Sequence, residues 1–514
     1  MHTQQFRKVT LPALLCILVW VGESVAQEPR TLTYDDAIAI ALKGSYTVKS
    51  YQASLQAMKF SFDYYRAQFK PRIDFSMNAP SLIENVAPIE RIDGLPVYNS
   101  TGVMKSGGEL RFTYMLPIGG NLSLYSQLYR EDRKTVLALK DYETLKDKNA
   151  NSSFSLNFEQ PIFTKNTLKE NLQQAEYQYM KSTHVFTRTQ MNIVYDVTNG
   201  FYSLYQAIRE VEIAQEKLKN SEEAYRIARL KNESGRIPEG EVLIAEVDMS
   251  SDRAALLESE GKLAREKDSL KQLIGLDTED DINIVTDLQY DTFAVDVGKA
   301  VEEALKNRLE ITESDLDIKL QEIKIDQANR IREFKGTISA YYDLTGVSTV
   351  GSGSTRSLFE SSFDNFVDRP PNRGVTLTFS YPVFDWGRGA SRVQQETVTL
   401  KRIQLEKEDL ELTIIREVKE VCRQVEETKA RLIIHEKNQQ NARRSYEISL
   451  MRFENGDISS QQLAQQQETL ADTQMAYLRA FIAYQLAVAD LKKQTLWDFK
   501  NNHSYLIDTY FQEK

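Results

Sequence analysis

The chain has 514 residues, with 64 Lys and Arg against 74 Asp and Glu, for a formal net charge of −10. A negative charge that is mixed along the chain argues against nucleic acid as a partner. Length alone would suggest three or four domains of about 150 residues each. A long internal repeat argues instead for one elongated body built from two similar halves.

The N-terminus has the parts of a secretory signal peptide. Arg7 and Lys8 precede an apolar stretch that ends at Ser24-Val25-Ala26, a cleavage site of small residues. We expect export, which leaves Cys422 as the single cysteine and allows no internal disulfide. The rest of the chain has no apolar run of about 18 residues, so any membrane insertion would have to use β-strands.

The two halves repeat the same landmarks. Pro161 precedes Gly235 by 74 residues, and Pro382 precedes Gly456 by the same 74 residues. No insertion separates the copies between these points, so a strand followed by a long helix is duplicated. We predict a signal peptide at 1–26, a first structural repeat at 27–292 and a second structural repeat at 293–514.

Each half is expected to open with a helix, at 32–68 and 297–334, and to continue with strands. Apolar residues alternate with Ser, Thr, Asn or Asp in these strands. Such alternation suits a barrel wall with lipid outside and water inside, or an ordinary half-buried sheet. The expected export and the long helices that follow favour the barrel wall over the ordinary sheet. The four expected strands lie around 73–77, 154–158, 338–344 and 375–381.

The first half is longer than the second between matching landmarks. Ala37 to Pro161 spans 124 residues, whereas Ala300 to Pro382 spans 82, a difference of 42. The extra residues include apolar alternation on both sides of a Pro117–Gly120 turn, which predicts a β-hairpin. This hairpin either adds strands to a barrel or forms an external loop.

A heptad pattern predicts two long helical hairpins. Apolar and small residues step by four and three from Ile414 to Phe453, and again 221 positions earlier, from Ile193 to Asn232. A helix from Lys165 to Ser234 would be roughly 100 Å long. Gly235 and Gly456 then mark the hairpin tips.

No catalytic, cofactor-binding or metal-ligating motif stands out. After residue 26 the histidines are His184, His435 and His503, and they form no metal-binding pair. Both His435 and Cys422 fall on or beside the heptad seam, where packing explains them better than chemistry. We therefore expect a protein that is not an enzyme and needs no cofactor.

Four or six strands cannot close a membrane barrel alone, since single-chain barrels start at about eight. Several copies of the chain must therefore form a ring and contribute strands to one barrel. The predicted fold is mainly α with a β-barrel part, in which the barrel is continued by an α-helical coiled-coil tunnel. Pro161 and Pro382 suit the corners where strand becomes helix.

The pattern resembles the TolC-type outer membrane efflux proteins over nearly the whole chain. Shared features are the A-x-x-x-A-L helices at 37–42 and 300–305, the Gln-Pro-x-Phe and Tyr-Pro-x-Phe corners, and the glycine tips. The resemblance implies a homotrimer with a 12-stranded or larger barrel in outer membrane lipid and a periplasmic tunnel. It also implies a periplasmic adaptor and an inner-membrane efflux pump, and passage of drugs or other exported substrates.

The resemblance also implies two functional regions. Adaptors of the family meet the tips, here Gly235-Arg236-Ile237 and Gly456-Asp457-Ile458; each Ile either enters a groove of the partner or staples its own hairpin. The family's closed end often has acids six and nine residues after the second glycine, where this chain has uncharged Gln462 and Gln465. The equivalent position of the first half, six residues after Gly235, has an acid, Glu241. Phe453 falls where the family often has an aromatic residue that helps to latch the closed state. The gate candidates are therefore Gln462, Gln465, Glu241 and Phe453.

Three other protein classes remain as alternatives. An exported coiled-coil structural protein without a pore would explain the heptads but not the matched strands or the proline corners. A periplasmic adaptor normally builds one helical hairpin, whereas this chain builds two. An exported enzyme lacks a catalytic motif here. The sequence indicates neither the cargo nor the class of pump.

Overall fold

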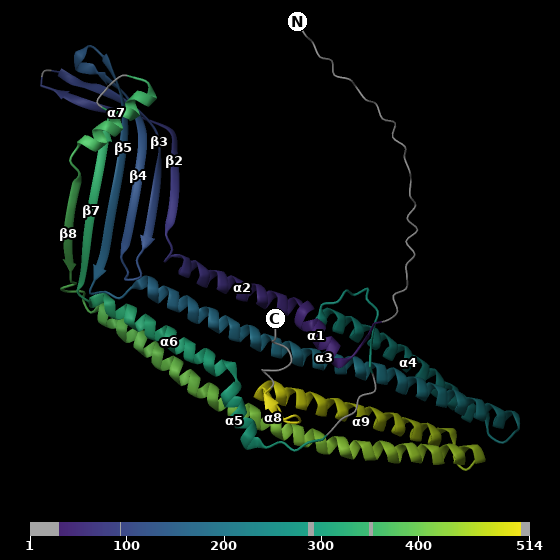
Figure 1. Ribbon diagram of the computed structural model, residues 1–514. Helices are drawn as coiled ribbons and strands as arrows, with labels where there is room; N and C mark the ends of the chain where they lie inside the picture. Colours follow the sequence, from purple (N-terminus) through teal and green to yellow (C-terminus); the bar gives the residue numbers. More distant parts are fainter. Residues whose placement is uncertain (1–29, 93, 286–291, 349–352, 505–514) are drawn as a thin grey trace, which may run out of the picture.

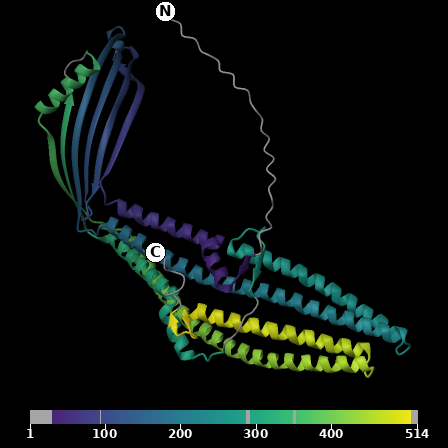
Figure 2. The same ribbon diagram turned by 45° about the vertical axis from the view of Figure 1, so that its right-hand side comes forward.

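The computed structural model describes residues 30–92, 94–285, 292–348 and 353–504. The predicted signal peptide lies outside these residues. A curved sheet stands at one end, and long helices leave its lower edge toward the other end (Figures 1 and 2). Within the described residues, no helix is both long and apolar enough to cross a membrane.

One antiparallel sheet holds six strands in the order β2-β3-β4-β5-β7-β8. The first half supplies four of them and the second half two. The strands of the extra 42 residues pair continuously with their neighbours, so the insertion extends the sheet and is not a separate loop. The bounds of the six strands are β2 Arg72–Arg91, β3 Gly94–Met115, β4 Asn121–Leu137, β5 Glu143–Ile162, β7 Lys335–Val347 and β8 Asn372–Ser380.

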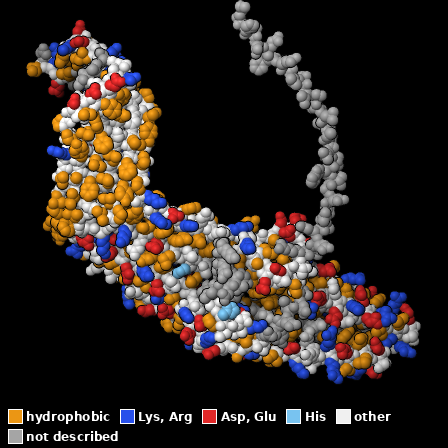
Figure 3. Space-filling model, viewed as in Figure 1, with side chains coloured by type: hydrophobic (Ala, Val, Ile, Leu, Met, Phe, Trp, Pro, Cys, Tyr) orange, Lys and Arg blue, Asp and Glu red, His pale blue; other side chains and the backbone are white. Residues whose placement is uncertain are grey.

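One face of this sheet is apolar across all six strands. Directly opposed residues of antiparallel strands project to the same face, and large apolar side chains cover the face seen in Figure 3. Phe75 is 69% exposed and Val375 is 76% exposed. One row joins Ile73, Phe112, Leu124, Leu156 and Tyr342; another joins Tyr114, Leu122, Phe158, Ala340 and Val375.

The opposite face of the sheet is polar. The row next to Ile73 joins Asp74, Arg111, Tyr125, Ser155 and Asp343. The Ser155 hydroxyl donates to the Asp343 carboxylate across the strands. The two-residue alternation predicted from the sequence therefore holds in all six strands.

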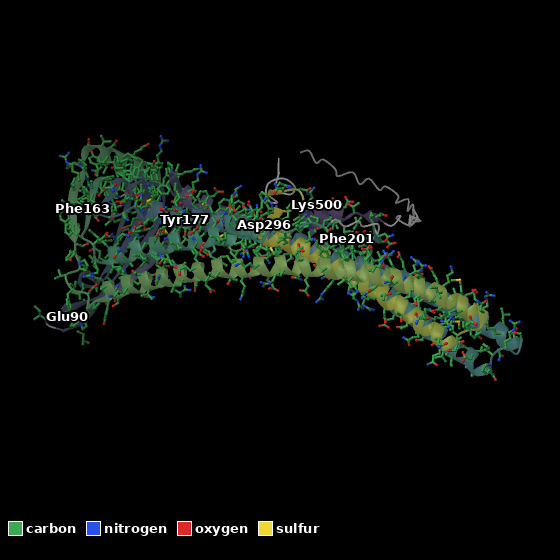
Figure 4. All side chains as sticks on the ribbon, turned by 90° about the horizontal axis from the view of Figure 1, so that it is seen from below. Glu90, Phe163, Tyr177, Phe201, Asp296 and Lys500 are labelled. Atoms are coloured by element: carbon green, nitrogen blue, oxygen red, sulfur yellow. The ribbon has the colours of Figure 1, made fainter. Side chains whose placement is uncertain are left out.

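Two helical hairpins follow the sheet, as the heptads predict. α3 spans Thr167–Glu233 and α8 spans Arg388–Asn455, 67 and 68 residues long. They return through α4, Glu239–Ile274, and α9, Ser460–Thr495. Figure 4 shows Phe163 beside the sheet, with Tyr177 and Phe201 farther along α3. Buried seam residues include Ile193, Val197, Leu204, Ile414, Val418, Val425 and Leu432.

The helix expected at 32–68 is broken into α1, Tyr34–Gly44, and α2, Tyr46–Ala67. Likewise, the one expected at 297–334 consists of α5, Val297–Asn307, α6, Leu309–Asn329, and the 3₁₀ turn η2, Arg330–Arg332. The prediction of one continuous helix at the start of each half was therefore wrong. The first break lies where the chain packs closely against the end of α4, because a Cβ on Gly44 would come within 2.9 Å of the Ile274 carbonyl oxygen.

The main core lies midway along the helices. α1 and α5 pack there against α3, α8 and α9, with Phe201, Leu204 and Ile414 fully buried. Cys422 is part of this core at 1% exposure. The remaining elements are β1 Arg30–Leu32 paired with β6 Ile282–Ile284, β9 Trp497–Asp498 paired with β10 His503–Ser504, η1 Ala138–Lys140, and α7 Thr355–Asp368.

The pairing of β2 with β3 can be tested by a disulfide. Phe75→Cys/Leu110→Cys should oxidise to an intrachain bond, because these residues are directly opposed, and opposed Cβ atoms lie about 4.5–5.5 Å apart. Phe75→Cys/Glu109→Cys is the control, since the two side chains project to opposite faces. Cys422 can remain, because burial raises the pKa of its thiol. Equal oxidation of both variants on a non-reducing gel would contradict the register.

Candidate functional site

The two hairpin tips lie together at the end of the molecule farthest from the sheet (Figure 1). Both use the same turn. Gly235 and Gly456 have positive φ angles of +72° and +89°, a region that disfavours side chains. The Gly235 and Arg236 amides donate to the carbonyls of Asn232 and Lys231 at 2.8 and 2.9 Å. Gly456 and Asp457 repeat these bonds, so each helix ends in a Schellman motif.

Gln462 closes the start of α9. The Ser459 hydroxyl accepts from the Gln462 amide at 3.3 Å, and the Gln462 side-chain oxygen accepts from the Ser459 amide at 3.1 Å. This capping box satisfies two backbone donors at the helix start. Gln462 therefore has a structural role, while Gln465 is exposed on the next turn of the same helix.

Glu241 occupies the position equivalent to Gln462 but makes a different contact. Its helix begins after Pro238, which has no N–H for a capping box. The Glu241 carboxylate instead accepts from the backbone amide of Ser460 at 3.0 Å, in the first turn of α9. An anion at a helix N-terminus is favourable. The bond therefore joins the two hairpins directly at their tips.

Phe453 anchors the small apolar cluster under the tips. Its side chain is 2% exposed and packs with Tyr446, Leu463 and other buried residues. The Lys231 ammonium lies 4.3 Å from the centre of the Phe453 ring and donates to the Phe453 carbonyl. Burial, and then the charge of Arg236, lower the pKa of Lys231. α3 and α8 are thus fastened together beside the glycines.

The isoleucines and the charged residues at the tips differ in exposure. Ile237 and Ile458 are partly buried against the Phe453 cluster, which is the position expected for stapling a hairpin. Arg236 and Asp457 are exposed. Both charge signs crowd this end of the molecule in Figure 3. A partner approaching this end would meet the charged side chains and the glycine backbone first.

A partly buried polar cluster above the tips was not predicted from the sequence. Lys217 of α3 contacts Asp252 of α4 at 3.1 Å and also pairs with Glu468 of α9. The Gln467 amide donates to the Lys217 carbonyl at 2.6 Å. Burial alone would lower the pKa of Lys217, but the bonds to Glu468 and Asp252 raise it. These groups hold three helices in one arrangement.

Comparisons with known proteins agree with this architecture. The profile of the family described as outer membrane efflux protein matches residues 118–276 and 300–495. The outer membrane protein VceC of Vibrio cholerae is similar, with a TM-score of 0.63, 14% identity, and coverage of 90% of this chain and 95% of that chain. No curated protein matches.

Two further structures share the fold. The CmeC outer membrane channel of Campylobacter jejuni has a TM-score of 0.62 at 14% identity, over 90% of this chain and 85% of that one. The open state of the MtrE outer membrane channel of Neisseria gonorrhoeae has a TM-score of 0.62 at 12% identity, over 90% and 88%.

Removing the cross-hairpin bond should loosen the start of α9. A hydrogen bond to a charged group contributes about 1.5–3 kcal/mol, so Glu241→Ala should speed local amide exchange at Ser460 and its neighbours about tenfold or more. Glu241→Gln, which keeps an acceptor, should lie between this variant and the parent. Hydrogen–deuterium exchange measures this. The control is Glu239→Ala, an exposed acid in the same turn; equal exchange in both alanine variants would refute the cross-cap.

Proposed function

The chain belongs to the outer membrane efflux protein family, and we propose that three copies form a channel through which drugs or other exported substrates leave the cell. The protein lies in the outer membrane, with its helical part in the periplasm. The channel is a duct and performs no chemistry on its cargo. The alternative is an exported coiled-coil protein or adaptor without a pore.

The main support is the apolar face shared by all six strands. At the helix end of the sheet, the apolar band begins with the row that contains Ile162 and Phe379. It ends with the row that contains Met77 and Leu128, and the two rows are ten residues apart along β5. At about 3.3 Å per residue and a tilt of about 40°, the band is roughly 25 Å tall, the height of a lipid-facing band in outer-membrane barrels.

Exposed aromatic residues mark the lower edge of this band. Phe163, Tyr381, Phe384 and Trp386 lie at the two corners between sheet and helices and are 59–89% exposed. Aromatic rings favour the boundary between hydrocarbon and water. The membrane would therefore end where α3 and α8 begin, and both long helices would extend into the periplasm.

The sheet edges support closure by several copies. In the described part of the chain, β2 and β8 each pair with a single neighbouring strand, and an unpaired backbone group in lipid costs several kcal/mol. β2 of one copy would therefore pair with β8 of the next. Three copies of six strands would make eighteen, the larger kind of barrel that the family resemblance allows beside one of twelve strands. Barrels of about 16–18 strands enclose an aqueous channel.

We place the gate at the tips, where the four candidate residues lie. Phe453 and Glu241 tie the two hairpins together, so loosening them would let the tips separate. Gln462 and Gln465 would form an uncharged ring around the closed end. Without carboxylates there, the entrance would not attract divalent cations strongly.

A periplasmic adaptor, itself attached to an inner-membrane pump, would dock at the tips. Its contact would include Gly235, Arg236, Gly456 and Asp457, which are exposed. Ile237 and Ile458 would shape the turns from beneath, because both are partly buried against the Phe453 cluster. Polar, charged contacts of this kind favour orientation and fast association.

Single-channel conductance in planar bilayers tests the duct and its gate. The parent should show a small, steady conductance that divalent cations do not block, whereas Gln462→Asp/Gln465→Asp should be blocked. Glu241→Ala/Phe453→Ala should conduct more, because Phe453→Ala alone removes about 3–5 kcal/mol of packing. Well-folded protein without any channel would refute the function; parent-like conductance of the alanine variant would refute the gate.

Photo-crosslinking in cells tests the docking surface. A benzoyl-phenylalanine at position 236 or 457 should capture a periplasmic protein that carries an adaptor's helical hairpin. The same probe at the exposed Lys219, which lies on α3 before its last four turns, is the control. Docking at the tips would be contradicted if the probe at position 219 captured the same protein equally well. It would also be contradicted if the tip probes captured no such protein in cells with active efflux.

A further inference from the structure

Helix α7 lies against the apolar face of the sheet, at its upper end (Figure 1). Ser152 and Gly346 form the uppermost row of the band on β5 and β7. The Ser362 hydroxyl of α7 lies 2.8 Å from the Ser152 hydroxyl and donates to the Gly346 carbonyl at 3.0 Å. A Cβ on Gly346 would come within 2.0 Å of the Ser362 carbonyl oxygen, so the helix is seated directly on the strand.

The outer side of α7 carries apolar side chains beside charged ones such as Arg356 and Glu360. Leu358 is fully buried against the sheet, whereas Phe363 is 47% exposed and Val367 is 80% exposed. A helix that shows apolar side chains beside a lipid-facing band suits the boundary between hydrocarbon and headgroups. α7 therefore marks the outer limit of the hydrocarbon layer, opposite the aromatic residues at the lower edge.

Above this limit the same face of the sheet becomes basic. Arg130 of β4 donates to the Thr355 hydroxyl at the start of α7, at 2.6 Å. Next above it, Asp132 opposes Lys148, and Lys134 opposes Lys146. All three lysines are exposed. Figure 3 shows charged side chains beginning just above the hydrophobic surface.

The charge of the three lysines is not balanced locally. Both oxygens of Asp132 accept from Arg130, at 2.7 and 2.6 Å. Glu84, in the row of Lys134 but two strands away, accepts from the Ser100 hydroxyl. Among the described residues, none of the three lysines enters a salt bridge. Like charges directly opposed across strands are unfavourable unless a counter-charge covers them.

We infer that Lys134, Lys146 and Lys148 form a binding site for the phosphate groups of outer-leaflet lipid headgroups, with α7 seated at the hydrocarbon boundary beside it. The position is continuous with the lipid-facing band, which places headgroups at this height. The inference rests on the sheet being embedded in the outer membrane, but not on gating or on the number of copies.

Lipid binding to the full mature protein in detergent tests the site, with diphosphorylated lipid A as the probe and native mass spectrometry as the readout. The parent should bind it more tightly than dephosphorylated lipid A. A lysine near an anionic headgroup contributes about fivefold, so Lys134→Gln/Lys146→Gln/Lys148→Gln should bind about 100-fold more weakly. The corresponding triple arginine variant should retain binding.

Lys219→Gln/Lys419→Gln/Lys437→Gln is the matched control, because it removes the same charge from exposed helical positions and should bind like the parent. Equal binding of the two lipids, or equal loss in both glutamine variants, would overturn the inference. Displacement of lipid A by an equal concentration of inorganic phosphate would also overturn it, by revealing a site for the free ion. Parent-like conductance of the sheet variant shows that it is folded.

Discussion

The two open edges of the six-stranded sheet impose the constraint on which the rest of the assembly depends. The apolar face places β2 and β8 in lipid, where their free backbone groups have no water to bind. Pairing with further copies would satisfy these groups, and the same closure would bring the helical hairpins of all copies into a ring. Exposed apolar residues on the hairpins, such as Leu243 and Val247 of α4, would then find cover against a neighbour.

The two halves are similar in backbone but not in the chemistry of their tips. Ser459 permits a capping box with Gln462, whereas Pro238 prevents one and leaves Glu241 to cap the other hairpin. Differences at two equivalent positions, Pro238 for Ser459 and Glu241 for Gln462, thus replace a local cap with a contact between the hairpins. In the gate that we propose, this contact would make opening of one tip dependent on the other.

Local patterns predicted the elements whose periodicity is strict. The heptads around Val418 and Leu204 defined both long helices, and alternation around Phe75 defined the apolar face. The upper lengths of β2 to β5 were missed, because charged residues replace apolar ones above the band. The breaks at Ser45 and Arg308, where the backbone leaves the helical region, were also missed, because the apolar pattern continues across both. The Lys217 cluster joins residues far apart in sequence that the other half does not repeat, so no spacing could reveal it.

Interchain disulfide formation between β2 and β8 tests whether several copies close one barrel. Within one chain these strands lie at opposite edges of the sheet, so a bond between them must join two copies. Cysteine pairs that combine Ile73, Phe75 or Met77 with Val375, Leu377 or Phe379 sample the unknown register in membranes. We expect at least one pair to yield covalent dimers and closed trimers on a non-reducing gel. Monomers from every pair, in protein that is folded and inserted, would contradict it.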